Sequence, residues 1–131
     1  MRVLVCGGRD LDESAVWNWL ERFGHQDAAE AVGRDERITS VIHGAASGAD
    51  NAAAGWGEFE GVRVIAYPAD WRKHGKAAGP IRNTQMLREG KPSLVIAFPG
   101  GRGTADMIRQ AEAADVPILY PAKLGFINPS R

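Results

Sequence analysis

Apolar residues along the chain are concentrated in five short runs, separated by longer stretches in which apolar and small residues recur at helical spacing. Short, largely apolar runs bounded by glycine, proline or polar residues predict strands that are buried on both faces. The alternation of such runs with helical periodicity predicts parallel strands joined by helices. The expected strands cover residues 3–6, 38–42, 62–66, 94–98 and 117–120.

The stretches between these runs predict four helices and one long loop. Asp12 or Ser14 is expected to cap the first helix, which ends near Phe23 or continues over residues 28–32. Over residues 68–79 we expect a long loop without structure of its own, a type of segment that is often functional or disordered. The other helices are expected from Ser47 onward, over residues 79–90, and from the glycine-rich turn at residues 99–104 onward.

This order of elements predicts an α/β fold, a Rossmann-like three-layer sandwich with a parallel five-stranded sheet. Right-handed crossovers restrict the topology, and the simplest strand order is 3-2-1-4-5. In such sheets ligands bind outside the carboxyl ends of the strands where the order reverses, here between the first and fourth strands. We expect one domain over residues 1–121, followed by a C-terminal tail over residues 122–131.

The composition narrows the class of protein further. The formal net charge is +0, so no field of the whole molecule attracts nucleic acid or an anionic membrane, and neither is an expected partner. Cys6 is the one cysteine, which excludes an intrachain disulfide and a multi-cysteine metal site and favours a reducing compartment. No apolar run approaches membrane length or resembles the core of a signal peptide. We therefore expect a cytoplasmic protein.

The sequence lacks the motifs of the common cofactor and metal sites. It has no G-x-x-x-x-G-K-[ST], and the first strand ends in Gly-Gly-Arg-Asp instead of the dinucleotide-binding G-x-G-x-x-G. His25, His43 and His74 are scattered without ligand spacing. We expect no cofactor and no metal site.

The glycine-rich turn at residues 99–104 reads Pro-Gly-Gly-Arg-Gly-Thr and joins the fourth strand to the next helix. Backbone N–H groups at a helix N-terminus bind anions such as phosphate, and glycine lets a ligand approach the backbone closely. The alternative is a tight connection that happens to be rich in glycine. Similar turns follow the first strand, at residues 7–10, and the second, at residues 43–50. Because all of them lie at the carboxyl edge of the sheet, we favour a composite phosphate-binding pocket.

Charged side chains near these turns indicate the ligand. Arginine and lysine suit a phosphate, and aspartate suits ribose hydroxyls. Trp71 either stacks on a base or packs its loop onto the domain. Arg82 lies in the first turn of a helix, where it opposes the helix dipole, and such a mismatch points to function. The expected ligand is a nucleotide-like small molecule. The residues expected to bind it are Gly7, Gly8, Arg9, Asp10, His43, Gly44, Ala45, Ser47, Gly48, Asp50, Asp70, Trp71, Arg82, Asn83, Pro99, Gly100, Gly101, Arg102, Gly103 and Thr104.

Taken together, these motifs resemble the SLOG superfamily, and within it the branch related to YspA and YpsA. The matching segments are residues 7–10, 43–50, 68–71, 75–83 and 99–107. The resemblance implies a Rossmann-like fold that binds nucleotides or nucleotide-derived ligands, in proteins that act as sensors or as enzymes. Relatives in this superfamily associate, so we expect a homodimer or a higher homo-oligomer.

The resemblance extends to LOG-type phosphoribohydrolases, whose signature is Pro-Gly-Gly-x-Gly-Thr-x-x-Glu preceded by an arginine on the third helix. Arg82 is the counterpart of that arginine, but Met107 occupies the position of the glutamate. Methionine has no acid or base function, and Asp106, one residue earlier, points about a quarter turn away on a helix. Arg82 and Asp106 are the candidate catalytic residues.

Three functions are consistent with these patterns. We favour the binding or sensing of a nucleotide-derived ligand, because the phosphate-binding turn is complete but lacks the glutamate of the enzymes. The second is a hydrolase that cleaves an N-glycosidic or related bond, with Asp106, Asp50 or Asp70 in place of the glutamate. The third is a DNA-processing role, by analogy with other members of the superfamily, and the zero net charge argues against it.

Overall fold

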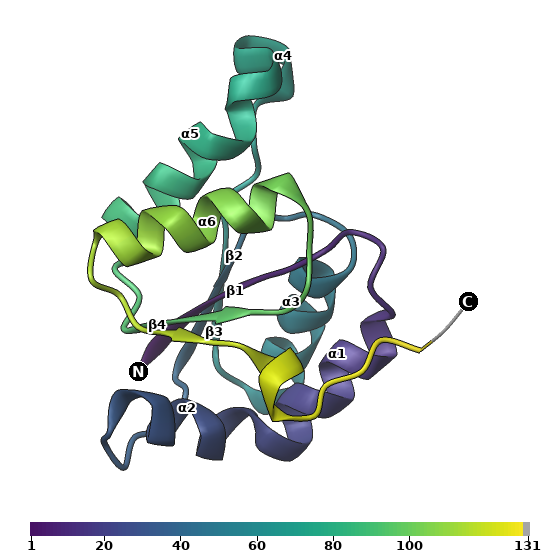
Figure 1. Ribbon diagram of the computed structural model, residues 1–131, viewed down its shortest axis with the longest axis vertical. Coiled ribbons are helices and arrows are strands. Elements are labelled where there is room, and N and C mark those ends of the chain that lie inside the picture. The colour runs from purple at the N-terminus through teal and green to yellow at the C-terminus, as the bar shows by residue number, and fades with distance from the viewer. Residues whose placement is uncertain (130–131) are drawn as a thin grey trace.

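The computed structural model describes residues 1–129, and these form a sheet of five parallel strands (Figure 1). The strand order is β3-β2-β1-β4-β5, and every neighbouring pair is parallel. This confirms the predicted α/β fold and the order 3-2-1-4-5. The order reverses at β1 and β4, which lie side by side at the centre of the sheet. The strands are β1 (Arg2–Cys6), β2 (Ser40–His43), β3 (Arg63–Ala66), β4 (Leu94–Ala97) and β5 (Ile118–Leu119).

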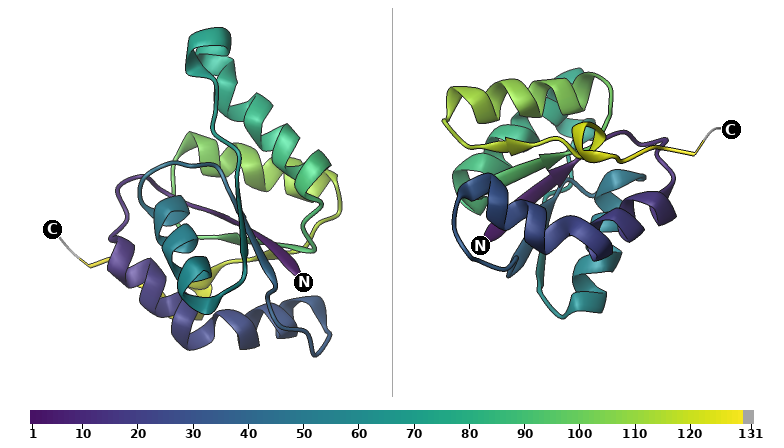
Figure 2. Two further views of the ribbon diagram at one scale, coloured as in Figure 1. Left: turned by 180° about the vertical axis from the view of Figure 1, so that it is seen from behind. Right: turned by 60° about the horizontal axis from the view of Figure 1, so that its bottom comes forward.

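Helices connect the strands and cover both faces of the sheet (Figure 2). In chain order the helical elements are α1 (Glu13–Trp19), η1 (Leu20–Gly24), α2 (His25–Val32), α3 (Ala49–Glu60), α4 (Trp71–His74), η2 (Gly75–Ala77), α5 (Ala78–Gln85), η3 (Met86–Gly90), α6 (Arg102–Ala113) and η4 (Pro121–Leu124). Two of the longer helical segments contain a π-helical turn. Two short pieces, α4 and η2, precede α5, and a short 3-10 helix, η4, follows β5.

The two faces of the sheet are covered by different parts of the chain (Figure 2). α1, α2 and α3 pack on one face, and α5 and α6 pack on the other. Successive side chains of a strand point to opposite faces, so in β1 Val3 and Val5 contact the first layer, whereas Leu4 and Cys6 contact the second. Both sets are buried, which explains why the strands appear as uninterrupted apolar runs. None of the helices described is both long enough and apolar enough to cross a membrane.

Element boundaries near the first helix are decided by side-chain hydrogen bonds. Asp12 is the cap, and the helix continues without a break to Val32. β2 begins at Ser40 and not at Ile38 as expected. The N–H of Ile38 donates to Nδ1 of His25 at 3.1 Å, so this residue is bonded to a helix side chain instead of a neighbouring strand.

The segment 68–79 is not a loop without structure, and the expectation there is wrong. It contains α4 and η2 and leads directly into α5. The carboxylate of Asp70 caps α4 by accepting the N–H of Lys73 at 3.1 Å, and the positive φ of +56° at Gly75 ends this helix. α4 and the start of α5 project beyond the rest of the molecule (Figure 1).

The described part of the expected tail packs against the body of the domain. Phe126 is buried, and its ring meets that of Phe98 edge to face with centroids 5.0 Å apart. The side-chain oxygen of Asn128 accepts the N–H of Asp12 at 2.8 Å, which places this segment beside the start of α1 (Figure 1). Residues 130 and 131 of the expected tail lie outside the described residues.

Candidate functional site

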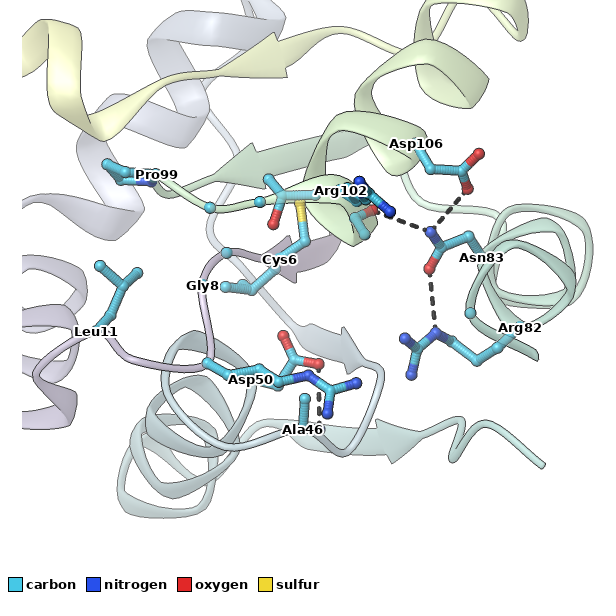
Figure 3. Close-up of a pocket in the computed structure, with 18 of the residues that line it drawn as sticks. Cys6, Gly8, Leu11, Ala46, Asp50, Arg82, Asn83, Pro99, Arg102 and Asp106 are labelled. Carbon is cyan, nitrogen blue, oxygen red and sulfur yellow. Dashed lines mark hydrogen bonds between the residues drawn. The ribbon is translucent and has the colours of Figure 1, made fainter. Parts of the chain in front are cut away.

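A pocket of about 840 Å³ lies at the carboxyl edge of the sheet, beside the ends of β1 and β4 (Figure 3). This is the point where the strand order reverses, and where open parallel sheets bind their ligands. The walls come from the turn after β1, the start of α3, the segment from α4 to η3 and the turn before α6. The predicted site residues that line it are Gly7, Gly8, Arg9, Asp10, Asp50, Trp71, Arg82, Asn83, Pro99, Gly100, Gly101, Arg102, Gly103, Thr104 and Asp106.

The other predicted site residues lie outside the pocket wall, and several of them support it. Ser47 donates its hydroxyl to the carbonyl of Arg9 at 3.2 Å. Gly48 donates its N–H to the carboxylate of Glu13 at 3.0 Å. These bonds join the loop before α3 to the turn after β1 and to α1. The residues in this group are His43, Gly44, Ala45, Ser47, Gly48 and Asp70.

Ala45 holds a left-handed conformation within this loop. Its φ is +60°, and its N–H donates to Nδ1 of His43 at 3.0 Å. This conformation costs an alanine roughly 1–2 kcal/mol, and glycine adopts it without that cost.

The N-terminus of α6 is the part of the pocket best suited to an anion. Gly101 caps the helix without a side-chain hydrogen bond, and the first helical bond runs from the N–H of Ala105 to the carbonyl of Gly101 at 3.0 Å. The N–H groups before Ala105 are the ones that a helix leaves without a helical partner. A Cβ at Gly101 or Gly103 would have no heavy atom within 4 Å apart from those of its chain neighbours and of the helix's own backbone. The space in front of this turn is therefore open to a ligand.

The turns after β1 and β4 approach each other so closely that only glycine fits at position 100. A Cβ at Gly100 would lie 2.2 Å from the hydroxyl of Thr104 and 2.8 Å from the backbone nitrogen of Gly8. Gly8 donates its N–H to the carbonyl of Pro99 at 2.8 Å. The two turns are thus in direct backbone contact, and they form one wall.

Asn83 connects α5 to the first turn of α6. It is 3% exposed, and its Nδ2 donates to the carbonyl of Gly103 at 3.2 Å and to the carboxylate of Asp106 at 3.0 Å. Its Oδ1 accepts Nε of Arg82 at 3.1 Å. Figure 3 shows Asn83 between Arg82 and Asp106, with its amide directed at both. One buried amide therefore holds a cation, a carboxylate and the glycine-rich turn before α6 in a fixed relation.

Arg82 is held in the pocket wall by backbone carbonyls. Because α5 begins at Ala78, Arg82 lies beyond the first turn, and the expectation that it opposes the helix dipole there is wrong. Its Nη1 donates to the carbonyl of Gly44 and, at 3.4 Å, to that of Tyr67. Burial lowers the pKa of Arg82, and the negative charge of Asp50 opposes that shift. A guanidinium stays charged in proteins, so the pocket keeps a fixed positive charge at this point.

Asp50 is a buried carboxylate at the start of α3. One of its oxygens accepts the N–H of Gly44 at 3.0 Å and that of Ala46 at 3.3 Å. Burial raises the pKa of Asp50 to about 6, although these hydrogen bonds and the positive charges of Arg82 and Arg9 lower it. A buried carboxyl group with a raised pKa in a pocket is typical of functional sites.

The raised pKa of Asp50 predicts how stability depends on pH. Because the folded-state pKa lies above the ordinary value of 3.8, the folded state binds this proton more tightly than the unfolded state. The stabilising contribution is complete below about pH 4 and is lost as the pH rises through about 6, a difference of roughly 3 kcal/mol. We expect the free energy of unfolding of Asp50→Asn to rise by roughly 3 kcal/mol relative to the wild type between about pH 4 and pH 7, in urea denaturation. A difference between the two proteins that does not change with pH would contradict this prediction.

Two other titratable groups near Asp50 are kept uncharged. Burial, together with the negative charge of Asp50, raises the pKa of the Cys6 thiol far above its usual range. Burial and the positive charge of Arg82 lower the pKa of His43. A protonated thiol is a poor nucleophile, so Cys6 serves as part of the pocket floor. In the described part of the chain, no three His, Cys, Asp or Glu side chains gather closely enough to hold a metal ion.

Asp106 and Met107 point in different directions. Asp106 lines the pocket and accepts hydrogen bonds from Asn83 at 3.0 Å and from Gln110 at 2.9 Å. Met107 is 1% exposed and packs with Leu4 and other apolar side chains between the sheet and α6. Adjacent residues of a helix are turned by about 100°, so they face different surroundings. The position that holds a glutamate in LOG-type enzymes is here part of the hydrophobic core.

Sequence reasoning does not identify several residues of the pocket wall. Arg109 lies 3.6 Å from the carboxylate of Asp106, and the i, i+3 spacing was the available signal. The sequence shows Lys76 as a cation in the segment before α5, but only the tertiary structure shows that it lies in the pocket wall. Asn128 reaches the pocket from the C-terminal segment, and no local pattern indicates it. The remaining residues are Val5, Cys6, Leu11, Ala46, Gly79, Pro80 and Met86.

Comparison with known families supports the family inferred from the sequence motifs. The family described as YAcAr, the YspA, cpYpsA-related SLOG family, matches residues 1–74. The chain belongs to this family. This confirms the resemblance inferred from the motifs, and SLOG membership indicates nucleotide-related binding or processing.

A phage protein is similar to this chain over a longer stretch. The Gene 61 protein of Mycobacterium phage D29 is 37% identical to this SLOG protein over 126 residues. The match covers 90% of this chain and 94% of the phage protein, so it includes the turn before α6, which lies beyond the residues matched by the family.

Proposed function

We propose that this SLOG protein binds or senses a nucleotide or a nucleotide-derived ligand, with a phosphate group at the N-terminus of α6. The observation that carries the proposal is the first turn of α6. It has no side-chain cap, and there is open space in front of Gly101 and Gly103. Free N–H groups and the helix dipole together favour a phosphate at such a position.

The charge of the pocket wall supports an anionic ligand. Cationic side chains outnumber carboxylates there, whereas the whole chain has a net charge of +0. The carboxylates offer acceptors for ribose hydroxyls, as acidic residues do in dinucleotide-binding folds. A volume of about 840 Å³ lies in the range of small-molecule sites and exceeds the need of a phosphate alone. The charged residues are Arg9, Lys76, Arg82, Arg102 and Arg109, with Asp10, Asp50 and Asp106.

The surroundings of Asp106 favour binding over turnover. Its Oδ2 accepts hydrogen bonds from Asn83 and Gln110, and its Oδ1 lies 3.6 Å from the guanidinium of Arg109. Both oxygens thus have protein partners that orient the group. Because Met107 is part of the core, the pocket also lacks the glutamate of the LOG-type reaction. We therefore assign Asp106 a role in orienting the ligand.

Isothermal titration calorimetry tests this proposal. The ligands are nucleoside monophosphates, ADP-ribose, NAD and nucleotide sugars, with the parent nucleosides as phosphate-free controls. We expect at least one phosphorylated ligand to bind, and its parent nucleoside to bind about tenfold more weakly or worse, because it lacks charge-assisted hydrogen bonds to the turn. A folded protein, as judged by thermal unfolding, that binds none of these ligands would refute the proposal.

One observation favours a second function, the hydrolysis of an N-glycosidic or related bond. Asp106 lines the pocket in the turn of α6 that follows the phosphate-binding residues, and Asn83 connects it to Arg82. This function predicts that the wild type releases a free base or ribose phosphate from a nucleotide and that Asp106→Asn does not. Binding without any release would remove this second function and leave the first.

A further inference from the structure

The net charge of +0 conceals a segregation of charge between two halves of the chain. Residues 1–61 carry eleven acidic and five basic side chains, whereas residues 62–131 carry five acidic and eleven basic ones. The acidic half supplies α1, α2 and α3 on one face of the sheet, and the basic half supplies α5 and α6 on the other face together with the projecting α4 (Figure 2). Such an asymmetry is a sign of contact with nucleic acid or a membrane. The zero sum therefore does not argue against a polyanion at the basic layer.

A short segment, residues 71–77, concentrates this positive charge, and we call it the basic arm. It comprises α4 and η2 and projects beyond the rest of the molecule (Figure 1). Arg72, Lys73 and Lys76 are exposed, and none of them forms an ion pair with another residue of the described chain. The neighbouring Asp70 is engaged in capping α4. Cations without partners on a projecting segment contribute nothing evident to the fold.

Trp71 provides an aromatic surface at the base of the basic arm. Its side chain is 48% exposed, and the guanidinium of Arg9 lies 5.4 Å from the ring centroid. Packing onto the domain therefore uses only part of the indole. Proteins bind single-stranded nucleic acid with this combination of groups, because bases stack on the aromatic ring while cations contact the phosphates.

The basic arm and the pocket form one continuous surface. Trp71 and Lys76 line the pocket, whereas Arg72 and Lys73, in the same α4 as Trp71, lie outside its wall. A mononucleotide with its phosphate at the N-terminus of α6 would fill only the pocket and would not reach the cations of the basic arm outside it. The cations outside the pocket wall match further phosphates of a longer ligand.

We infer that the ligand of this pocket is one nucleotide of a single-stranded nucleic acid, whose neighbouring nucleotides lie along the basic arm with a base stacked on Trp71. The inference rests on the proposed function, because it uses the same phosphate position at the N-terminus of α6. A nucleic acid fits this surface better than an acidic polypeptide, because its flat bases stack on the exposed indole. A single strand fits better than a duplex, because its bases have free faces.

Calorimetry at low salt compares deoxyadenosine monophosphate with 5′-phosphorylated tetradeoxyadenylate. We expect the tetranucleotide to bind roughly tenfold more tightly or better, because it adds phosphate contacts and a stacked base. The double variant Arg72→Ala/Lys73→Ala is expected to lose this gain, to keep its affinity for the mononucleotide, and to show a salt slope smaller by about 1.4. Trp71→Ala is expected to weaken tetranucleotide binding about tenfold, and Trp71→Phe, which keeps a stacking ring, to recover most of that loss.

A matched control removes the same charge elsewhere. Arg63 and Arg88 are exposed and lie toward the amino edge of the sheet, at the start of β3 and shortly before β4. Arg63→Ala/Arg88→Ala is expected to bind the tetranucleotide like the wild type, and an equal loss in this control would overturn the inference.

Three results with the wild-type protein would also overturn it. Equal affinity for the mononucleotide and the tetranucleotide would overturn the inference and leave the proposed function intact. Failure of both the mononucleotide and the tetranucleotide to bind would also overturn the inference. In that case the calorimetric series of small ligands tests the proposed function by itself. An octaglutamate peptide that displaces the tetranucleotide with equal affinity would assign the basic arm to acidic polypeptides.

Discussion

Substitution of Gly103 by alanine is expected to weaken binding of the phosphate-bearing ligand about thirtyfold or more without destabilising the fold. Apart from its chain neighbours and the helix's own backbone, a Cβ at Gly103 would meet no heavy atom within 4 Å, so the substitution causes no collision inside the protein. The Cα–Cβ bonds of a helix tilt toward its N-terminus, so the methyl group would point toward the space in which we place the phosphate. Loss of one charge-assisted hydrogen bond, about 2 kcal/mol, corresponds to binding about thirtyfold weaker.

Two measurements separate the binding effect of Gly103→Ala from its effect on stability. Calorimetry follows the affinity, and urea denaturation is expected to show a free energy of unfolding that is unchanged or higher by up to about 1 kcal/mol, because alanine is the better helix former. Gly55→Ala is the matched control. Gly55 is an exposed residue of α3, and a Cβ there would be 4.0 Å from the nearest heavy atom, a ring carbon of Trp17. This variant is expected to have similar stability and wild-type affinity. Undiminished affinity in Gly103→Ala would contradict the phosphate position.

Substitution of Gly48 by alanine is expected to reduce the free energy of unfolding by about 3–5 kcal/mol. Gly48 has a φ of +74°, which an L residue rarely adopts, and a Cβ there would lie 2.1 Å from the carbonyl oxygen of Gly8. The loop cannot easily retreat, because Ala49 donates its N–H to Gly8 at 3.2 Å and Ser47 bonds to Arg9. Backbone strain and the collision are therefore both present, and their costs add.

Gly33 offers a control in which only the backbone strain is present. Its φ is +69°, but a Cβ there would have no heavy atom within 4 Å. Gly33→Ala is expected to cost about 1–2 kcal/mol, the ordinary price of a left-handed alanine. Urea denaturation of both variants with an unchanged slope gives the comparison. Equal losses in the two variants would show that the contact between the loop before α3 and the turn after β1 is looser than the structure has it.

The framework of the fold could be predicted from the sequence because its signals are local. Runs such as residues 94–97 are buried on both faces, and this produces an uninterrupted apolar pattern. The handedness of crossovers then restricts the order of the strands. The prediction was wrong at residues 68–79, because α4 has four residues and is too short to show helical periodicity. The one local signal for this helix is Asp70, whose carboxylate caps it.

The residues of the candidate site could be predicted only as a group. Glycine turns mark the ends of strands in the sequence, and the carboxyl ends of parallel strands share an edge. Whether a residue faces the pocket or supports it depends on contacts between distant segments. Gly48 meets Gly8 across 40 positions, and Asn83 meets Gly103 across 20. Because no local pattern encodes such pairs, the supporting role of Ser47 and Gly48 was not predicted.

The sequence by itself determined the strand order, the edge of the sheet at which the turns gather, and the family, since each follows from local patterns. Only the tertiary structure decided that Asp106 lines the pocket and that Met107 is part of the core. The direction of each side chain depends on how α6 is rotated against the sheet. The tertiary structure also decided the raised pKa of Asp50, which comes from burial by segments far apart in the chain. The composition gives the charge of +0 only as a sum, and the tertiary structure decided that Lys76 lies in the pocket wall while Arg72 and Lys73 lie outside it.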